Sequence, residues 1–239
     1  MPVFTISSQF GAGASDVGRR VAERLRLRYV DQSVLVDAAR ELGVSIRSLE
    51  KHDEKVDSFR ERMVRFLQRA LEHSAAVGSV DPLMGAGNLE LMLSEGYEDM
   101  MESSKIRTLN DETYRTTVSN VITDLASEGS LVVIGRGGQM ILKENPGTIH
   151  VQVVAEEEIR SRRVMQWLSL SSDEARKRIR RFNQSRTDFH RKFWNVDVWD
   201  PRLYDLVINT THLSYEAAAD CIISVSEELS VRKSFSVEK

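Results

Sequence analysis

The stretch VFTISSQFGAGASDVG, residues 3–18, joins an apolar, β-branched run to a glycine-rich turn and then to the start of a helical pattern. The run at 3–7 is short and bounded by the turn, which is typical of a buried strand in a parallel sheet. Beyond the turn, Val17, Val21 and Leu25 recur at helical spacing, with arginines on the opposite face. A buried strand, a glycine turn and a helix in this order predict the opening unit of an α/β fold.

The alternation of short apolar runs and helical patterns continues along the chain. Further strands are predicted at 28–30, 131–134, 149–154 and 206–209, and further helices at 35–42, 111–127, 156–167, 173–192 and 214–229. Short strands separated by helices predict a parallel sheet with right-handed crossovers. Because ligands bind beyond the carboxyl ends of such strands, we expect the site near Gly11–Ser15, Asp31, Arg136 and Thr210.

Composition limits the classes of protein to which the chain belongs. The 239 residues are 41% hydrophobic and 29% charged, which favours a packed globular core over disorder. A formal net charge of −3 argues against broad nucleic-acid binding, and no apolar run is long enough for a membrane helix. The N-terminal residues lack the pattern of a signal peptide. Cys221 alone supports no disulfide within the chain, so we expect a cytoplasmic protein. Cys221 lies in an apolar helical pattern, which predicts a core residue.

The glycine turn can be aligned with the phosphate-binding consensus G-x-x-x-x-G-K-[ST]. The alignment puts Ser8 at the first glycine, Gly13 at the second, Ala14 at the lysine and Ser15 at the hydroxyl that binds magnesium. Backbone amides and a helix N-terminus still favour an anion here. The alternative is a tight turn that binds no ligand, and the loop alone does not decide between the two.

Two further segments contain arginines in suggestive positions. LVVIGRGGQMIL, residues 131–142, is a buried strand that ends at Arg136, whose guanidinium suits a phosphate or a carboxylate. Residues 175–210, ARKRIRRFNQSRTDFHRKFWNVDVWDPRLYDLVINT, are basic and then aromatic. They fit either a solvated basic helix or a lid over 169–202 that closes on a transferring phosphoryl group.

Together and in this order, these segments resemble the cytidylate kinase-like family, a branch of the nucleoside monophosphate kinases. The matching stretches are TISSQFGAGASDVGRRVAERL with YVDQSVL, LVVIGRGGQMIL, EARKRIRRFNQSRTDFHRKFW and DPRLYDLVINTTHLSYEAA. The resemblance covers both ends of the chain and leaves residues 45–105 unmatched. These we expect to be a helical and loop insertion, and a candidate acceptor-binding or dimer region, within a single domain over 1–239.

The resemblance implies a three-layer P-loop kinase fold with a five-stranded parallel sheet flanked by helices, and an ATP-dependent phosphotransferase that uses Mg²⁺. By position, the phosphate loop comprises Gly11, Ala12, Gly13, Ala14, Ser15 and Asp16, with Ser15 as the metal ligand. Arg136 matches the arginine that faces the acceptor phosphate. The lid arginines are Arg180, Arg181, Arg186 and Arg191, of which Arg186 aligns most firmly. A nucleotide or another small phosphorylated acceptor is implied as partner, with neither nucleic acid nor membrane.

The chain departs from true cytidylate kinases at two positions. Ala14 replaces the loop lysine, and Gly137 stands where they have an aspartate after Gly-Arg. The first difference keeps open a nucleotide-binding sensor or regulatory protein without turnover. Both differences bear on the cytidylate specificity. The unmatched residues 45–105, which lie where acceptor-binding segments are usually inserted, keep open a small-molecule kinase with a non-nucleotide acceptor.

Overall fold

The computed structural model describes residues 2–31 and 111–236, so the helix predicted at 35–42 and the insertion predicted at 45–105 lie outside the described residues. The chain divides into two compact units, residues 1–29 with 129–239 and residues 30–128. The first unit contains the glycine loop, the Gly-Arg segment and the basic helix. The described part of the second unit consists of Val30, Asp31 and residues 111–128.

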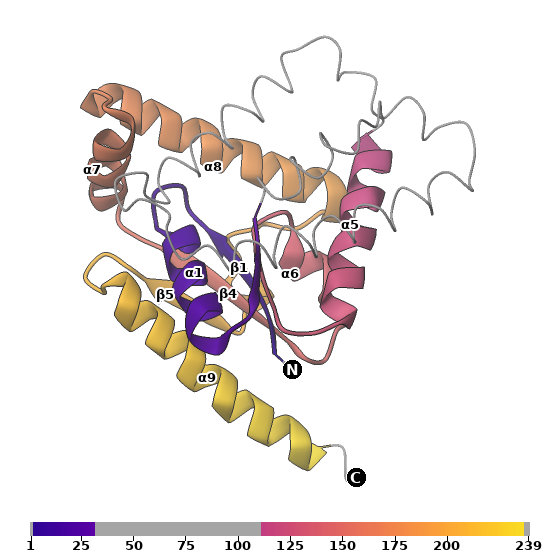
Figure 1. Cartoon of the computed structure of the whole chain (residues 1–239). Coiled ribbons are helices and arrows are strands. Elements are labelled where there is room, and N and C mark those ends of the chain that lie inside the picture. The colour runs from indigo at the N-terminus through magenta and orange to yellow at the C-terminus, as the bar shows by residue number, and fades with distance from the viewer. Residues whose placement is uncertain (1, 32–110, 237–239) are drawn as a thin grey trace. The chain divides into compact units, whose positions relative to one another are not determined.

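Five strands form one sheet in the order β2-β3-β1-β4-β5 (Figure 1). Their bounds are β1 Val3–Ser8, β2 Arg28–Val30, β3 Leu131–Ile134, β4 Thr148–Val154 and β5 Leu206–Asn209. Central β1 pairs in parallel with β3 on one side and with β4 on the other. Every residue of β1 is buried, which explains why 3–8 shows no alternation of polar and apolar residues. The predicted five-stranded parallel α/β fold is confirmed.

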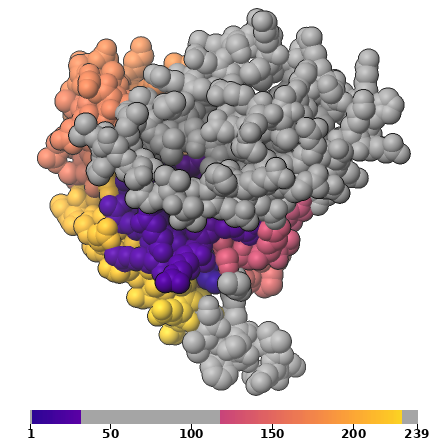
Figure 2. Space-filling view, viewed as in Figure 1, coloured from indigo at the N-terminus to yellow at the C-terminus, as the bar shows by residue number. Residues whose placement is uncertain are grey.

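Helices flank this sheet. Three of them start close to the predicted residues, α7 Glu157–Leu168, α8 Ser172–Trp194 and α9 Tyr215–Ser236, and α1 Ala14–Leu25 follows the glycine turn as expected. The short helix α6 Gly138–Ile141 was not predicted. Helices α1 and α9 pack against each other, and Figure 2 shows them side by side at the surface in indigo and yellow. Helix α9 extends beyond the end predicted at 229.

The main core joins one face of the sheet to α1 and α9. It contains Phe4 and Val151 from the sheet, Val17 and Val21 from α1, and Ile222 from α9. The prediction that Cys221 packs in the core is wrong, because Cys221 is exposed. Its neighbour Ile222 is fully buried in its place. A second cluster, of Phe10, Val164, Ala175 and Ile179, attaches α7 and α8 to the loop after β1.

Helix α8 starts at a well-formed N-cap. The Ser171 hydroxyl accepts a hydrogen bond from the Glu174 amide, and the Glu174 carboxylate accepts one from the Ser171 amide at 2.9 Å. The helix then runs unbroken for 23 residues. Most of the predicted lid segment, 169–202, is therefore one long helix, followed by the 3₁₀ turn Pro201–Leu203.

In the second unit, helix α5 covers Asp111–Ser127, as predicted. Val121, Ile122 and Leu125 recur at helical spacing and are fully buried, or nearly so. None of the helices in the described ranges is long and apolar enough to cross a membrane.

Candidate functional site

The turn between β1 and α1 has the backbone of an anion cradle. Gly11 and Gly13 adopt left-handed conformations with φ of +82° and +92°, which side chains other than that of glycine rarely permit. Gly13 is the N-cap of α1, and no side chain of the described residues caps the helix there. The first amides of α1 therefore present their donors and the positive end of the helix dipole at the carboxyl end of β1.

Protein packing also requires glycine at these positions. A Cβ added to Gly13 would lie 2.6 Å from Cζ of Tyr215, and one added to Gly11 would lie 3.1 Å from Cβ of Arg160. Both distances are shorter than ordinary van der Waals contact. The ring of Tyr215 thus covers the outer side of the loop, so the glycines alone do not prove a phosphate site.

The three residues after Gly13 are the first turn of α1. Ala14 is 1% exposed and belongs to the main core, so a buried methyl group stands at the lysine position. Ser15, the predicted magnesium ligand, is also buried. Burial raises the pKa of the Asp16 carboxyl, and the nearby Arg20, Arg19 and Arg163 oppose that rise. Only Ser15 and Asp16 therefore offer side-chain oxygens in this turn.

Two arginines of α7, which sequence reasoning did not identify, hold the loop from outside. Arg163 donates to the carbonyl of Gly11 at 3.4 Å and to that of Thr210 at 2.7 Å, and its guanidinium lies 5.1 Å from the ring centroid of Tyr215. Arg160 is 5% exposed and donates to the carbonyls of Phe10 and Ala155. The sequence pattern that could have identified them is their i, i+3 spacing on the helix that directly follows β4.

Helix α8 crosses the same loop with one face. Phe182 stacks on Phe10 with ring centroids 4.3 Å apart, and the Asn183 side chain accepts a hydrogen bond from the Phe10 amide at 3.1 Å. One turn later, the Arg186 guanidinium donates to the carbonyl of Ser8. Of the predicted lid arginines, only Arg186 lies on this face. The others, Arg180, Arg181 and Arg191, are exposed.

The Gly-Arg segment forms a tight turn immediately after β3. The Gly138 amide donates to the Gly135 carbonyl at 3.0 Å, and Arg136 and Gly137 between them have φ of +55° and +70°. These angles define a type I′ turn. The left-handed backbone of Arg136 destabilises the folded protein by about 1–2 kcal/mol. A Cβ on Gly137 would lie 2.8 Å from Cζ3 of Trp194. Trp194 therefore fills the space that a side chain at position 137 would enter.

The loop and the Gly-Arg turn are neighbours because β1 and β3 pair directly. The Gly135 amide donates to the Ile6 carbonyl at 2.9 Å, so the two strands end side by side. The Arg186 guanidinium lies between them, with one nitrogen 3.8 Å from the position of a Cβ on Gly135. The structure thus brings together the loop, the Gly-Arg turn and Arg186 within the first unit.

A buried polar cluster lies beside Arg186. The His190 ring donates through Nδ1 to the Arg186 carbonyl at 2.8 Å and accepts through Nε2 from the side-chain amide of Gln139 at 2.9 Å. Burial lowers the pKa of His190 to about 4, so the ring is neutral. The Tyr204 hydroxyl donates to the Val198 carbonyl at 2.8 Å, and burial raises its pKa.

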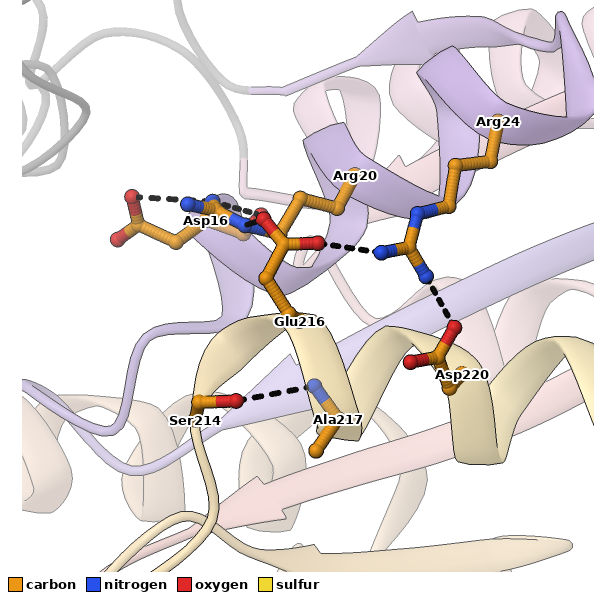
Figure 3. Close-up of polar contacts among 7 residues, drawn as sticks. All are labelled: Asp16, Arg20, Arg24, Ser214, Glu216, Ala217 and Asp220. Carbon is orange, nitrogen blue, oxygen red and sulfur yellow. Dashed lines mark hydrogen bonds and ion pairs between the residues drawn. The ribbon is translucent and has the colours of Figure 1, made fainter.

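Ion pairs on the other side of the loop join α1 to α9. Glu216 accepts from Arg20 at 2.6 Å and also from Arg24, which donates in addition to Asp220 (Figure 3). The Ser214 hydroxyl caps α9 by accepting from the Ala217 amide at 3.1 Å. These contacts fix the start of α9, and with it Tyr215, over the glycine loop.

Within the described ranges, no group of three or more His, Cys, Asp or Glu side chains could hold a metal ion. A magnesium ion here would take most of its ligands from phosphate and water. Asp31, predicted near the site, directly follows β2, is buried, and falls in the second unit.

Comparison with one solved structure supports the fold. A crystal structure of an uncharacterized protein from Eubacterium ventriosum superposes with a TM-score of 0.57 at 15% identity, covering 95% of this chain and 99% of that one. A shikimate kinase from Acinetobacter baumannii in complex with shikimate gives a TM-score of 0.46 at 15% identity, covering 94% and 92%.

Sequence comparison gives two partial relatives and one family. A uronate isomerase from Corynebacterium glutamicum is 30% identical over 102 residues, which are 43% of this chain and only 20% of that protein. A cytidylate kinase from Methanopyrus kandleri is 28% identical over 131 residues, 52% of this chain and 67% of that protein. The profile of the cytidylate kinase-like family matches residues 3–212. Since this match takes in β1 through β5 with both motifs and the basic helix, the chain belongs to the cytidylate kinase-like family.

Proposed function

We propose that this protein is an ATP-dependent phosphotransferase that acts on a nucleoside monophosphate or a similar small phosphorylated acceptor. The observation that carries the proposal is the set of groups that meet at the ends of β1 and β3. An uncapped helix N-terminus lies on one side, an arginine turn lies on the other, and Arg186 lies between them. Membership of the cytidylate kinase-like family supports the same reaction class.

On the donor side, the proposal assigns the triphosphate to Gly11–Asp16. When bound, MgATP supplies the transferable phosphoryl group and the charge compensation of the metal. The amides of Ala14 and Ser15 would donate to phosphate oxygens, and the Ser15 hydroxyl would be the protein's ligand to magnesium. Arg163 would keep the loop in shape by bonding its carbonyls from outside.

On the acceptor side, the proposal assigns the anionic group to Arg136. The guanidinium would hold a phosphate bidentately and orient an oxygen toward the donor. Phosphoryl transfer to a phosphate acceptor needs little general base, so charge and alignment carry the rate. The predicted roles of Arg180, Arg181 and Arg191 would require a rearrangement, since all are exposed on α8.

A sensor that binds nucleotide without turning it over remains the second candidate. The observation that favours it is Ala14, whose buried methyl group leaves the loop without its own lysine. A small-molecule kinase with a non-nucleotide acceptor is the third, favoured by Trp194 in the space beside Gly137.

One experiment separates these functions. ADP release is measured with MgATP across the nucleoside monophosphates, and ATP binding is measured by calorimetry on the same preparation. The kinase predicts acceptor-dependent ADP release that Arg136→Ala lowers by about 10–100-fold, the loss expected for a bidentate charged contact. Binding without turnover for any acceptor would establish the sensor. Absence of ATP binding would exclude both.

A further inference from the structure

We propose that Arg186 is the resident cation of the phosphate loop and takes the place of the missing lysine. The inference rests on the proposed function for its ligand, the terminal phosphates of ATP. It goes further by stating that this arginine is already in position before any lid closes. A resident cation contributes to ground-state binding, whereas a cation delivered by closure contributes mainly to turnover.

The first argument is the atom that Arg186 contacts. Its guanidinium donates to the backbone carbonyl of Ser8, which aligns with the first glycine of the phosphate-binding consensus. The same guanidinium approaches Gly135 at the end of β3. A positive charge thus lies at the mouth of the loop, between the two strand ends where ligands of such sheets bind.

The second argument is that α8 is docked firmly on the loop. The stack of Phe182 on Phe10 and the bond from the Phe10 amide to Asn183 attach the helix one turn before Arg186. Ile179, a further turn back, is 1% exposed within the second apolar cluster. Because these contacts hold the stretch of α8 before Arg186 against the loop, the charge is preorganised and binding requires little further ordering of the side chain.

The third argument concerns the other groups beside the loop in the described part of the chain, where Arg20 donates to Glu216 at 2.6 Å and Arg19 lies over the Tyr29 ring. Ala14 is enclosed in the main core, so the loop's own position offers no route for a lysine. Arg163 donates hydrogen bonds to the carbonyls of Gly11, Ala12 and Thr210 and lies over the Tyr215 ring. These contacts suit a residue that holds the loop in place. His190 is buried and neutral, so it neither replaces nor repels the Arg186 charge.

The test measures affinity rather than activity. Isothermal titration calorimetry with MgATP and with inorganic tripolyphosphate is run on the wild type, Arg186→Ala and Arg186→Lys. Loss of a charge-assisted contact of ~1.5–3 kcal/mol predicts that Arg186→Ala weakens both ligands by about 10–100-fold. Arg186→Lys should recover part of the affinity, and added methylguanidinium should restore part of it to Arg186→Ala.

Two control variants separate charge from docking. Arg176→Ala removes an exposed arginine of the same helix and should leave both affinities within about twofold, as for surface substitutions. Asn183→Ala removes a neutral loop contact and should lower stability more than tripolyphosphate affinity. An equal loss of affinity in Asn183→Ala and Arg186→Ala would overturn the proposal, because docking alone would then explain it.

The remaining outcomes are also decisive. Unchanged affinity in a folded Arg186→Ala variant that turns over slowly would make Arg186 a closing lid arginine and refute residency. A wild type that binds neither ligand would refute both this inference and the proposed function. A wild type that binds both, depends on Arg186 and never releases ADP would keep the inference and refute the kinase.

Discussion

The left-handed backbone of Arg136 predicts that stability and function conflict at this position. Arg136 has φ of +55° at the first central position of a type I′ turn, where glycine is the unstrained choice. The strain is about 1–2 kcal/mol for a residue with a side chain. Glycine gains that amount in the folded state and loses about 0.4–1 kcal/mol through its greater freedom in the unfolded chain. The expected net advantage of glycine over alanine is therefore about 0.5–1 kcal/mol.

The matched pair Arg136→Gly and Arg136→Ala isolates this strain, because both variants lack the guanidinium and all its contacts. Arg136→Gly should melt about 1–4 °C above Arg136→Ala in a domain of this size. Both should lose acceptor-dependent ADP release to the same extent, since the missing charge is the same. Differential scanning calorimetry and the ADP-release assay on the two proteins provide both readouts. An alanine variant as stable as the glycine variant, or more stable, would refute the left-handed turn, and unequal activities would refute the role given to the charge.

Three further predictions concern the loop and the buried histidine. MgATP at a hundredfold excess over its Kd should stabilise the fold by ~2.7 kcal/mol and raise Tm by about 5–10 °C, and a flat thermal-shift titration would contradict a nucleotide site. Gly13→Val should lower the free energy of unfolding by about 2 kcal/mol or more, because position 13 has a φ of +92° and the new side chain would clash with Tyr215. In a Tyr215→Ala protein the same change should cost less, and an equal cost with and without the Tyr215 ring would exclude the clash. The pKa of His190 is about 4 in the folded protein, below the usual 6.5, so the unfolded chain binds more protons between these pH values and the free energy of unfolding should fall by on the order of 2 kcal/mol from pH 7 to pH 4.5. Urea denaturation at both pH values should show a smaller fall in His190→Gln than in the wild type, and an equal fall would refute the role of His190.

The elements of the sheet could be predicted because each rests on a local pattern. The run at 3–8, the glycines at 11 and 13 and the helical repeat after them give a strand, a turn and a helix. The prediction that Cys221 packs in the core failed because neighbouring residues of a helix point about 100° apart. Ile222, one residue later, occupies the buried position.

The environment of the loop could not be predicted in the same way. Arg163 and Tyr215 reach it from residues far along the chain, and each resembles an ordinary helix residue in its local sequence. The inward face of α8 was not inferred from the sequence, although Ala175, Ile179 and Phe182 recur at helical spacing and form that face. The contacts of Phe182 and Asn183 with Phe10 are what single out Arg186 among the arginines of α8.

The pairing of α1 with α9 has a consequence for how the protein is made. The first helix and the last described helix pack together and complete the main core, although about 200 residues separate them. At a synthesis rate of about 5–20 residues per second, β1 leaves the ribosome roughly 10–45 s before α9 is available to cover its neighbours. Strand β1 can pair with β3 and β4 once these are made, but the apolar face of α1 that α9 covers stays open until the end of translation. Slow synthesis should expose this face to chaperones or to aggregation, and faster delivery of α9 should raise the yield of folded protein.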